Sequence, residues 1–465
     1  MSTQTNAAGT PQASPATRTS SIRTVVFASL IGTAVEWYDF FLYGSAAALV
    51  FGKLFFPESD PVTGTLLAFG TYALGFVARP LGGVVFGHFG DRVGRKKVLV
   101  LSLLMMGVAT VAIGLLPTYA AIGVGAPILL LVCRLVQGFA VGGEWGGAVL
   151  MAAEHGKDED RGFWSSWPQA GVPLGNMLAT AVLFVLSAVQ SPATFEAWGW
   201  RVPFLLSAVL VFIGLVVRVR LEESPVYQEA RAQIAQRKDE ANHLPFLEVI
   251  RTYPKEVLLA MGMRMAENIS YYIFTVVVIA YAKDFAKVGT GLILQMLLIG
   301  AAFQFLLIPA LGALSDRVGR RPLYLVGALG VGVWSFFFLG LAGSQSGPKI
   351  LLAVVVGLFF HSLMYAPQAA FFSELFGTSV RYTGASVGYQ LASIFAGALA
   401  PIIAVKLLAT GNGSNTIAVA YYVSAASVIT IVAVLLSKET RCTSLRHDRV
   451  VRGAHREAEL AGERA

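Results

Sequence analysis

The chain has 465 residues, of which 55% are hydrophobic and only 13% are charged, and its formal net charge is +8. Together with a mean hydropathy of +0.66, this composition excludes a soluble globular protein, because too few polar residues are present to cover a fold of this length. The positive charge does not indicate nucleic-acid binding, since the basic residues are spread over alternate loops between apolar runs.

Long apolar runs follow one another along the chain. A bilayer core of about 30 Å takes roughly 20 apolar residues per helix, and continuous runs favour helices over barrel strands of alternating polarity. The sequence therefore predicts an all-α membrane protein with twelve transmembrane helices. In the first half the expected spans are residues 25–51, 63–89, 97–116, 126–152, 163–188 and 202–219. In the second half they are 255–282, 290–314, 322–342, 349–373, 382–408 and 415–437.

The segments around these spans are polar. Basic residues follow the second, sixth and eighth spans, so the positive-inside rule predicts that these loops and both termini are cytoplasmic in a cell membrane. The start of the chain lacks the apolar core of a signal peptide. The expected organisation is a disordered tail at 1–22, a six-helix bundle at 23–220, a linker at 221–253, a second bundle at 254–437 and a tail at 438–465.

A ten-residue pattern occurs twice, each time between two apolar spans. Residues 87–96 read GHFGDRVGRK and residues 312–321 read GALSDRVGRR, an offset of 225 residues when the two aspartates are compared (316 minus 91). A Glu and an Arg seven residues apart also recur, as Glu154 with Arg161 and Glu374 with Arg381. Repeats at this offset predict two pseudo-symmetric six-helix bundles.

The repeated loop resembles the signature loop of the major facilitator superfamily. Residues 32–44 (GTAVEWYDFFLYG) and 134–147 (RLVQGFAVGGEWGG) further resemble the metabolite:proton symporter family, over roughly residues 23–437. The resemblance implies the major facilitator fold and alternating access around a site between the halves. It also implies a monomer that imports a small organic acid, shikimate-like or a related carboxylate, with protons as coupling ion and no other cofactor.

Other classes of function lack their motifs. No phosphate-cradling G-x-x-x-x-G-K-[ST] loop is present, and neither H-E-x-x-H nor G-x-S-x-G occurs, so we expect secondary transport and no enzyme. The two cysteines, Cys133 in a span and Cys442 in the tail, predict no disulfide or metal site. The expected partners are solute, protons and membrane lipids. Electrostatics leave open a zwitterionic osmolyte such as proline or glycine betaine as solute, or an uncoupled uniporter or solute sensor.

Two carboxylates lie inside the first expected span. Glu36 and Asp39 share one helical face with Gly32 and Tyr43. A charge at mid-bilayer costs at least about 2.5 kcal/mol, and two ionised carboxylates one turn apart repel each other, so one is expected to hold a proton. Asp39 is the preferred proton carrier. The alternative is that both carboxylates pair with arginines of neighbouring helices.

Two arginines lie inside the second and fourth spans. A guanidinium binds a carboxylate through two parallel hydrogen bonds, so Arg79, and Arg134 followed by Gln137, are candidates for holding an organic anion. Alternatively, Arg134 pairs with Glu144 or Asp39 as a structural contact. Further substrate-binding candidates, chosen on polarity, are Tyr43, Gln169, Tyr365 and Gln390.

The second half holds fewer charges in its spans. Arg264 and Glu267 are one turn apart and are expected to pair. Glu267 and Glu144 are additional candidates for proton coupling. His361 either belongs to the coupling route or is a bundle histidine with satisfied hydrogen bonds.

The repeated loops are candidates for a gate. Asp91 and Asp316 are expected to cap neighbouring helix N-termini while nearby arginines reach Glu154 and Glu374. The alternative is a plain cytoplasmic loop that obeys the positive-inside rule. The resemblance implies the gating role for the first loop, and the full set of predicted gating residues is Gly87, Asp91, Arg92, Gly94, Arg95, Glu154, Arg161, Asp316, Arg317, Arg320, Glu374 and Arg381.

Overall fold

The computed structural model describes residues 22–93, 95–142, 149, 152–153, 158–220, 249, 251–376, 381–411, 413–441 and 443. The expected linker and most of both expected tails lie outside these residues, so the predicted domain boundaries stay predictions. Within these ranges, the backbone alone is described at 84, 87–93, 95, 96, 99, 158, 218–220, 381 and 382.

The first half consists of six long helical runs and short helices between them. The runs are α1 (Ile22–Ala46) with η1 (Ala47–Phe51) and α2 (Gly52–Phe55), α3 (Pro61–Val93), α4 (Arg95–Leu115), α6 (Gly125–Val141), α8 (Arg161–Val189) and α10 (Arg201–Arg220). The short helices are α5 (Tyr119–Ile122), η2 (Asp158–Asp160), α9 (Pro192–Thr194) and η3 (Phe195–Gly199).

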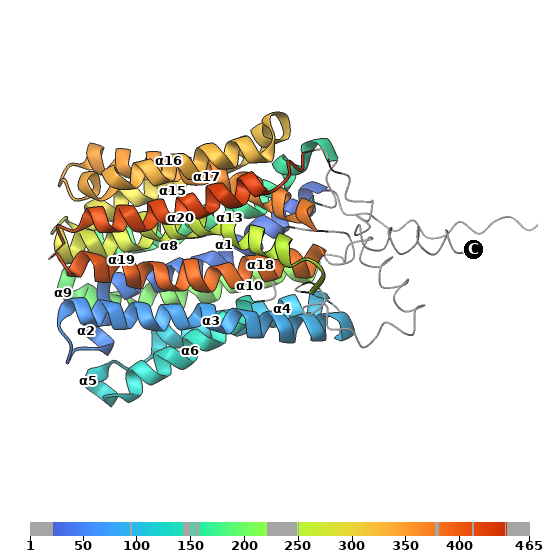
Figure 1. Ribbon diagram of the computed structural model, residues 1–465. Helices are drawn as coiled ribbons and strands as arrows, with labels where there is room; N and C mark the ends of the chain where they lie inside the picture. Colours follow the sequence, from blue (N-terminus) through green and yellow to red (C-terminus); the bar gives the residue numbers. More distant parts are fainter. Residues whose placement is uncertain are drawn as a thin grey trace, which may run out of the picture.

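The second half repeats this arrangement. Its runs are α13 (Pro254–Tyr272) with η5 (Ile273–Val277), α14 (Val278–Ala280) and η6 (Tyr281–Phe285), α15 (Thr290–Val318), α16 (Arg320–Ala342), α17 (Gly347–Leu375), α18 (Arg381–Ser393) with η7 (Ile394–Ala398) and α19 (Leu399–Ala409), and α20 (Thr416–Leu436). Figure 1 shows the long helices lying side by side along one common direction.

Each predicted span coincides with one of these runs to within a few residues, except that the described part of the fourth ends at Val141. Among the described residues, nine helical runs are long and apolar enough to cross a membrane. A tenth is formed by Pro192–Gly199 together with Arg201–Val217 of α10, with a bend of 49° between them. The apolar parts of α4 and α6 are shorter, at Val100–Leu115 and Gly125–Val141. They complete the twelve helices of the all-α fold.

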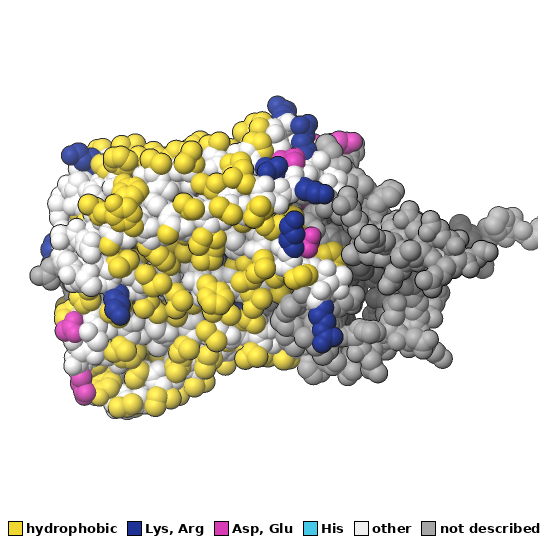
Figure 2. All heavy atoms as spheres, in the orientation of Figure 1, with side chains coloured by type: hydrophobic (Ala, Val, Ile, Leu, Met, Phe, Trp, Pro, Cys, Tyr) yellow, Lys and Arg dark blue, Asp and Glu magenta, His cyan; other side chains and the backbone are white. Residues whose placement is uncertain are grey.

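The outer surface fits a bilayer. Figure 2 shows a hydrophobic belt across the middle of the face in view, with Lys, Arg, Asp and Glu gathered toward its two ends. Large apolar side chains of the long helices are exposed, such as Leu306 on α15 at 72%, Val108 on α4 at 68% and Phe212 on α10 at 66%. In water such a belt would mark an aggregation surface, whereas lipid tails cover it at no cost.

The duplication is visible in the backbone as well as in the loops. A π-helical segment interrupts the first span at Ala47–Phe51 and the seventh at Ile273–Val277, an offset of 226 residues when their first residues are compared (273 minus 47). Segments of this kind are rare and mark places where a helix is widened, often at functional sites. The two halves meet mainly where α8 packs against α15 and where α3 packs against η7 and α19.

Glycines let α3 and α6 touch through their backbones. A Cβ added to Gly138 would lie 1.9 Å from the carbonyl oxygen of Gly75, and one added to Gly142 would lie 1.9 Å from that of Arg79. Helices in membranes approach this closely only where small residues face each other. The contact brings Arg79 on α3 and Arg134 on α6 to the same region of the first half.

Candidate solute site

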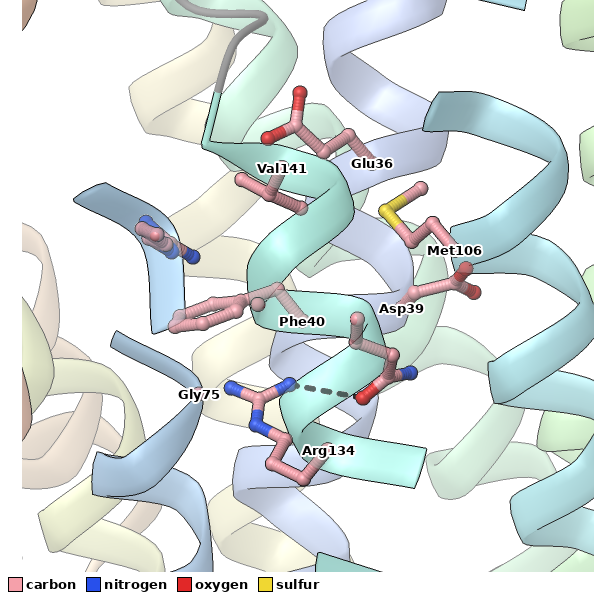
Figure 3. Close-up of a pocket in the computed structure, with 10 residues that line it drawn as sticks. Glu36, Asp39, Phe40, Gly75, Met106, Arg134 and Val141 are labelled. Atoms are coloured by element: carbon pink, nitrogen blue, oxygen red, sulfur yellow. Dashed lines mark hydrogen bonds between the residues drawn. The ribbon is translucent and has the colours of Figure 1, made fainter. Parts of the chain in front are cut away.

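The first half encloses a small polar cavity (Figure 3). The space open to water is about 10 Å³, roughly what one water molecule needs. Residues from α1, α3, α4 and α6 line it, and they are Glu36, Asp39, Phe40, Gly75, Arg79, Met106, Arg134, Gln137, Gly138 and Val141. The structure thus brings together five predicted residues from three helices, namely Glu36, Asp39, Arg79, Arg134 and Gln137.

Asp39 is held by two hydroxyl groups. Its carboxylate accepts hydrogen bonds from Thr110 Oγ1 at 2.8 Å and from Ser207 Oγ at 2.5 Å, and the residue is 1% exposed. Gln137 donates to Thr110 at 2.7 Å and accepts from Arg134 at 3.1 Å. A chain of hydrogen bonds therefore joins the Arg134 guanidinium to the Asp39 carboxylate without a direct ion pair between them.

Both guanidinium groups of the cavity lie against aromatic rings. The Cζ atom of Arg79 is 4.6 Å from the centre of the Phe40 ring, and that of Arg134 is 4.7 Å from the centre of the same ring. Phe76 and Trp37 complete the surroundings of Arg79, and Tyr43 and Tyr72 those of Arg134. Rings stabilise a buried cation by about 2 kcal/mol or more once water is removed.

The two guanidinium groups keep unused hydrogen-bond donors. Arg79 Nε, Arg134 Nε and Arg134 Nη2 have no hydrogen-bond partner among the described residues, although both side chains are 2% exposed. No carboxylate of the described residues lies within 4.0 Å of either group. Buried donors of this kind are costly to leave unmade. An anionic ligand that enters the cavity would satisfy them.

A second cavity lies between the halves and also offers about 10 Å³ to water. Its lining comes from α1, α8, α13, α17 and α18, and consists of Trp37, Val172, Arg264, Glu267, Asn268, Tyr271, Tyr272, His361, Tyr365 and Tyr389. Arg264 and Glu267 form the predicted ion pair at 2.8 Å. The Arg264 guanidinium also stacks on Tyr389, with its Cζ atom 3.2 Å from the ring centre.

Four of the predicted gating residues form one cluster between the halves, which we call the latch: Arg161, Asp316, Arg320 and Glu374. The Asp316 carboxylate accepts from the backbone N–H groups of Gly162 and Phe163, both at 2.8 Å, and so caps the start of α8 in the other half. Arg161 pairs with Glu374 at 2.8 Å, and Arg320 pairs with Asp316 at 2.7 Å and with Glu374 at 3.4 Å.

The halves are also joined at the opposite end. Lys283 in η6 donates to the carbonyl oxygen of Leu49 at 2.8 Å, and Thr65 donates to Asp284 at 3.2 Å. With contacts at both ends and only about 10 Å³ open in each central cavity, the structure is in an occluded conformation.

Comparisons with known proteins agree with this architecture. The model of the family described as "Sugar (and other) transporter" matches residues 24–449. The chain belongs to this family. An inner membrane metabolite transport protein of Escherichia coli, YhjE, is 43% identical over 426 residues, covering 90% of this chain and 95% of the relative. The shikimate transporter of the same organism is 40% identical over 425 residues, covering 91% and 96%.

A proline/betaine transporter of Escherichia coli is 34% identical over 431 residues, covering 90% of this chain and 84% of the relative. Among solved structures, the proton:xylose symporter XylE of the major facilitator superfamily superimposes with a TM-score of 0.69 at 17% identity, covering 91% of this chain and 97% of that one. This likeness confirms the major facilitator fold of the transporter. Both fold and relatives are those of membrane transporters and not of enzymes.

The remaining predicted residues of the transporter, apart from Tyr365, do not line the two cavities. Gln169 donates to the carbonyl oxygen of Tyr365 at 3.3 Å, and Gln390 donates to that of Gly142 at 3.3 Å, so both amides join the two halves. Tyr365 itself lines the second cavity, and Tyr43 packs against Arg134. Arg317 is exposed and stands apart from the latch.

Several predictions fall where the transporter is not described. Glu144, Gly94 and Glu154 lie outside the described residues, as do the side chains of Asp91, Arg92, Arg95 and Arg381. Gly87 belongs to α3, but its surroundings are not described. The roles predicted for these residues stay predictions.

The sequence reasoning missed three polar groups of the transporter. Thr110 and Ser207 hold Asp39, and Gln304 contacts His361. Each is a lone polar residue inside an apolar run, which is a usable signal because polar groups within a membrane are expensive and need partners. Hydroxyl and amide residues are frequent in such runs, however, so the signal finds candidates without naming their partners.

Proposed function

We propose that the transporter is a proton-coupled symporter that imports a small organic acid, shikimate-like or a related carboxylate, across the cytoplasmic membrane by alternating access. The observation that carries the proposal is the charge balance of the first cavity. Glu36 and Asp39 contribute two carboxylates, and Arg79 and Arg134 contribute two guanidinium groups. With all four ionised, the described cavity is neutral.

A neutral cavity couples anion and proton. An added carboxylate leaves the cavity with one uncompensated negative charge, and at this depth an unpaired charge costs several kcal/mol. Protonation of one acid restores neutrality, so anion and proton bind more tightly together than apart. This mutual dependence is what a symporter requires.

The contacts support separate roles for the arginines, which bind the solute, and for Asp39, which binds the proton. The unused donors of Arg79 and Arg134 bind the solute carboxylate, and the aromatic rings around them exclude water. Asp39 takes the proton, because its two partners are hydroxyl groups that accept as readily as they donate and therefore fit either protonation state. Glu36, Glu144 and Glu267 remain the further candidates for proton coupling.

Alternating access uses the contacts at the two ends of the bundle. Release of the latch opens the end that carries the repeated loops, and this end is cytoplasmic by the distribution of Lys and Arg. Release of the Lys283 and Asp284 contacts opens the other end. The occluded conformation is the intermediate between the two open states. The transporter acts as a monomer with cytoplasmic termini, and the proton is its coupling ion.

A zwitterionic osmolyte is the second candidate solute, favoured by the aromatic lining of the second cavity and by the likeness to a proline/betaine transporter. Aromatic cages bind quaternary ammonium groups. A zwitterion adds no net charge to the first cavity, however, so it creates no demand for a proton there. The charge balance therefore favours the organic anion.

Uptake into proteoliposomes tests the proposal. An imposed inward proton gradient is expected to drive accumulation of radiolabelled shikimate, and a protonophore is expected to abolish it. Competition with an aromatic acid, a dicarboxylate and glycine betaine identifies the solute class. Asp39→Asn should lose accumulation while retaining solute exchange. Uptake that only equilibrates in the wild type would contradict proton coupling and indicate a uniporter.

A further inference from the structure

His361 belongs to a polar cluster in the second half that the proposed carboxylate site does not use. Its ring Nε2 lies 3.2 Å from Glu267 Oε1, and its Nδ1 lies 2.9 Å from Gln304 Nε2. The three side chains come from α17, α13 and α15, and each is at most 3% exposed. The ring also lines the cavity between the halves.

The contacts define the present form of the ring. In this orientation of the Gln304 amide, its nitrogen faces Nδ1 and only donates, so the contacts fit a ring that accepts at Nδ1 and donates from Nε2 to Glu267. Glu267 also accepts from Arg264 at 2.8 Å and from Gln368 at 3.2 Å. One carboxylate and one guanidinium thus make the cluster neutral, as in the first cavity.

Gln304 holds an unused acceptor beside the ring. Its Oε1 has no hydrogen-bond partner among the described residues, although the side chain is fully buried at 0% exposed. A half-turn of the amide would exchange the nitrogen for this oxygen next to Nδ1, and the oxygen would then accept from a protonated Nδ1. The cluster therefore satisfies the neutral ring in one amide orientation and the charged ring in the other.

Apart from Glu267 and Arg264, the described groups that face the His361 ring carry no charge. Tyr271 on α13 stacks on it with ring centres 4.6 Å apart, and Tyr365 on its own helix lies 5.3 Å away. From α16, Tyr324 reaches the cluster only through its hydrogen bond with Gln368. Glu267 is the carboxylate in contact with His361, and Arg264 is the cation that shares that carboxylate.

The other described helices that pack against α17 place charged side chains in contact with it only near its C-terminal end. There the helix carries Glu374, which pairs with Arg161 on α8 and Arg320 on α16 in the latch. A proton on the ring therefore adds one positive charge to a cluster that was balanced.

We propose that His361 is a second proton-binding site of the transport cycle, held between Glu267 and Gln304. The proposal rests on the proposed function, in which Asp39 takes the first proton. A monoanion accompanied by protons on Asp39 and His361 moves as a complex with one net positive charge. Its transport is therefore driven by the membrane potential as well as by the pH gradient.

The test separates the two driving forces in proteoliposomes, with radiolabelled shikimate as the probe. A potassium diffusion potential set by valinomycin, inside negative and without a pH gradient, should drive accumulation by the wild type. His361→Gln should lose this response at least about tenfold and keep accumulation driven by a pH gradient. Glutamine can still donate to Glu267 and accept from Gln304, so the cluster keeps its hydrogen bonds.

Ser362→Ala is the matched control, because it removes a polar neighbour of Gln304 that cannot titrate at these pH values, and it should respond like the wild type. A wild type that follows the pH gradient but not the potential overturns the second proton site and leaves the proposed function intact. A His361→Gln variant with full response to the potential overturns it as well. A wild type driven by neither gradient contradicts the proposed function itself.

Discussion

At the scale of single residues, the site depends on keeping two buried guanidinium groups free of carboxylate partners among the described residues. Arg79 and Arg134 share the ring of Phe40, and Gln137 satisfies one Arg134 donor. An acid group at either arginine would use the donors that a solute needs. Aromatic rings stabilise the charge without using those donors, which keeps the site available for an anion.

Gly75 provides the space for Arg134. A Cβ in Gly75→Ala would lie 2.6 Å from Arg134 Nε, so the flexible side chain must move while the helix stays in place. We expect about a tenfold or greater loss of affinity for the organic anion, equivalent to about 1.4 kcal/mol, measured by equilibrium binding. Gly70→Ala on the same helix is the control, because its Cβ meets nothing within 4 Å. Equal affinities of the two variants would contradict the placement of Arg134 in the site.

Much of this residue-level site follows from the sequence, because charged residues inside apolar runs are few and must face a cavity or a partner. The structure brings Glu36, Asp39, Arg79 and Arg134 to one cavity, which lies within the first half and not between the halves as expected. The sequence reasoning left open whether Arg134 pairs with Asp39, and the structure shows Gln137 and Thr110 between them. Side-chain pairing across helices depends on rotation of each helix, which apolar periodicity alone does not determine.

At the scale of elements, the latch is reinforced by the described residues after α20, 437–441 and 443, which we call the strap. Thr440 donates to Glu374 at 2.5 Å, and the carbonyl oxygen of Thr443 accepts from Arg161 at 2.9 Å. Glu439 accepts from the backbone N–H groups of Arg320 at 2.9 Å and Arg321 at 3.0 Å, and thereby caps α16. The strap therefore contacts both halves while the latch is closed.

The docking of the strap is expected to depend on pH. Partial burial raises the pKa of Glu439, but backbone N–H donors, those of Arg320 and Arg321 foremost, outweigh it and lower the pKa below the usual 4.5. The cap therefore stabilises docking fully above that usual value, and its contribution is lost as the pH falls through the lowered pKa. A fluorophore on Cys442 should report release only in acid for the wild type, and release at all pH values for Glu439→Gln.

The same signal at every pH in both proteins would contradict the cap. Glu256→Gln, in the first turn of α13, serves as the control and should behave like the wild type.

Of the four latch residues, Glu374 is expected to be the most sensitive to mutation. Glu374→Gln leaves the side chains of Arg161 and Arg320, at most 1% exposed, without this carboxylate. Loss of one partner of a buried pair costs about 3–5 kcal/mol. The closed conformation is therefore destabilised relative to the conformation that is open at the latch. Spin labels at Asp160 and Arg317, both exposed, should show a longer distance between the halves.

The control for this prediction is Glu196→Gln, which breaks the exposed ion pair with Lys53 in the first half, at the end of the bundle opposite the latch. Exposed pairs contribute about 1 kcal/mol or less, so the label distance should stay as in the wild type. An unchanged distance in Glu374→Gln would show that the pair does not hold the latch.

The elements themselves were largely predictable, because the length of an apolar run must match the bilayer and leaves little freedom. The repeated loop likewise predicted that Asp316 lies at a helix N-terminus, and the structure shows that this is α8 of the other half. The π-helical segments at Ala47–Phe51 and Ile273–Val277 were not predicted. They contain ordinary apolar residues, so no residue type marks them, and the strap was read only as a solvated tail.

At the scale of the whole molecule, two neutral polar clusters lie in the middle of a bundle closed at both ends. Each consists of carboxylates and guanidinium groups in equal number among the described residues. Such clusters tolerate burial when empty and become unbalanced by an anion or a proton alone. The solute anion is therefore expected to cross the occluded state together with protons and not alone, which links the charge balance of the site to alternating access.

The most direct test of coupling is the number of protons taken up when solute binds. Purified transporter in weakly buffered detergent solution is mixed with shikimate, and the pH change is recorded against the amount of solute bound. We predict at least about one proton per bound anion, a value lower by about one proton in Asp39→Asn, and no proton uptake with glycine betaine. Binding of the anion by the wild type without any proton uptake would contradict the coupling between carboxylate and proton.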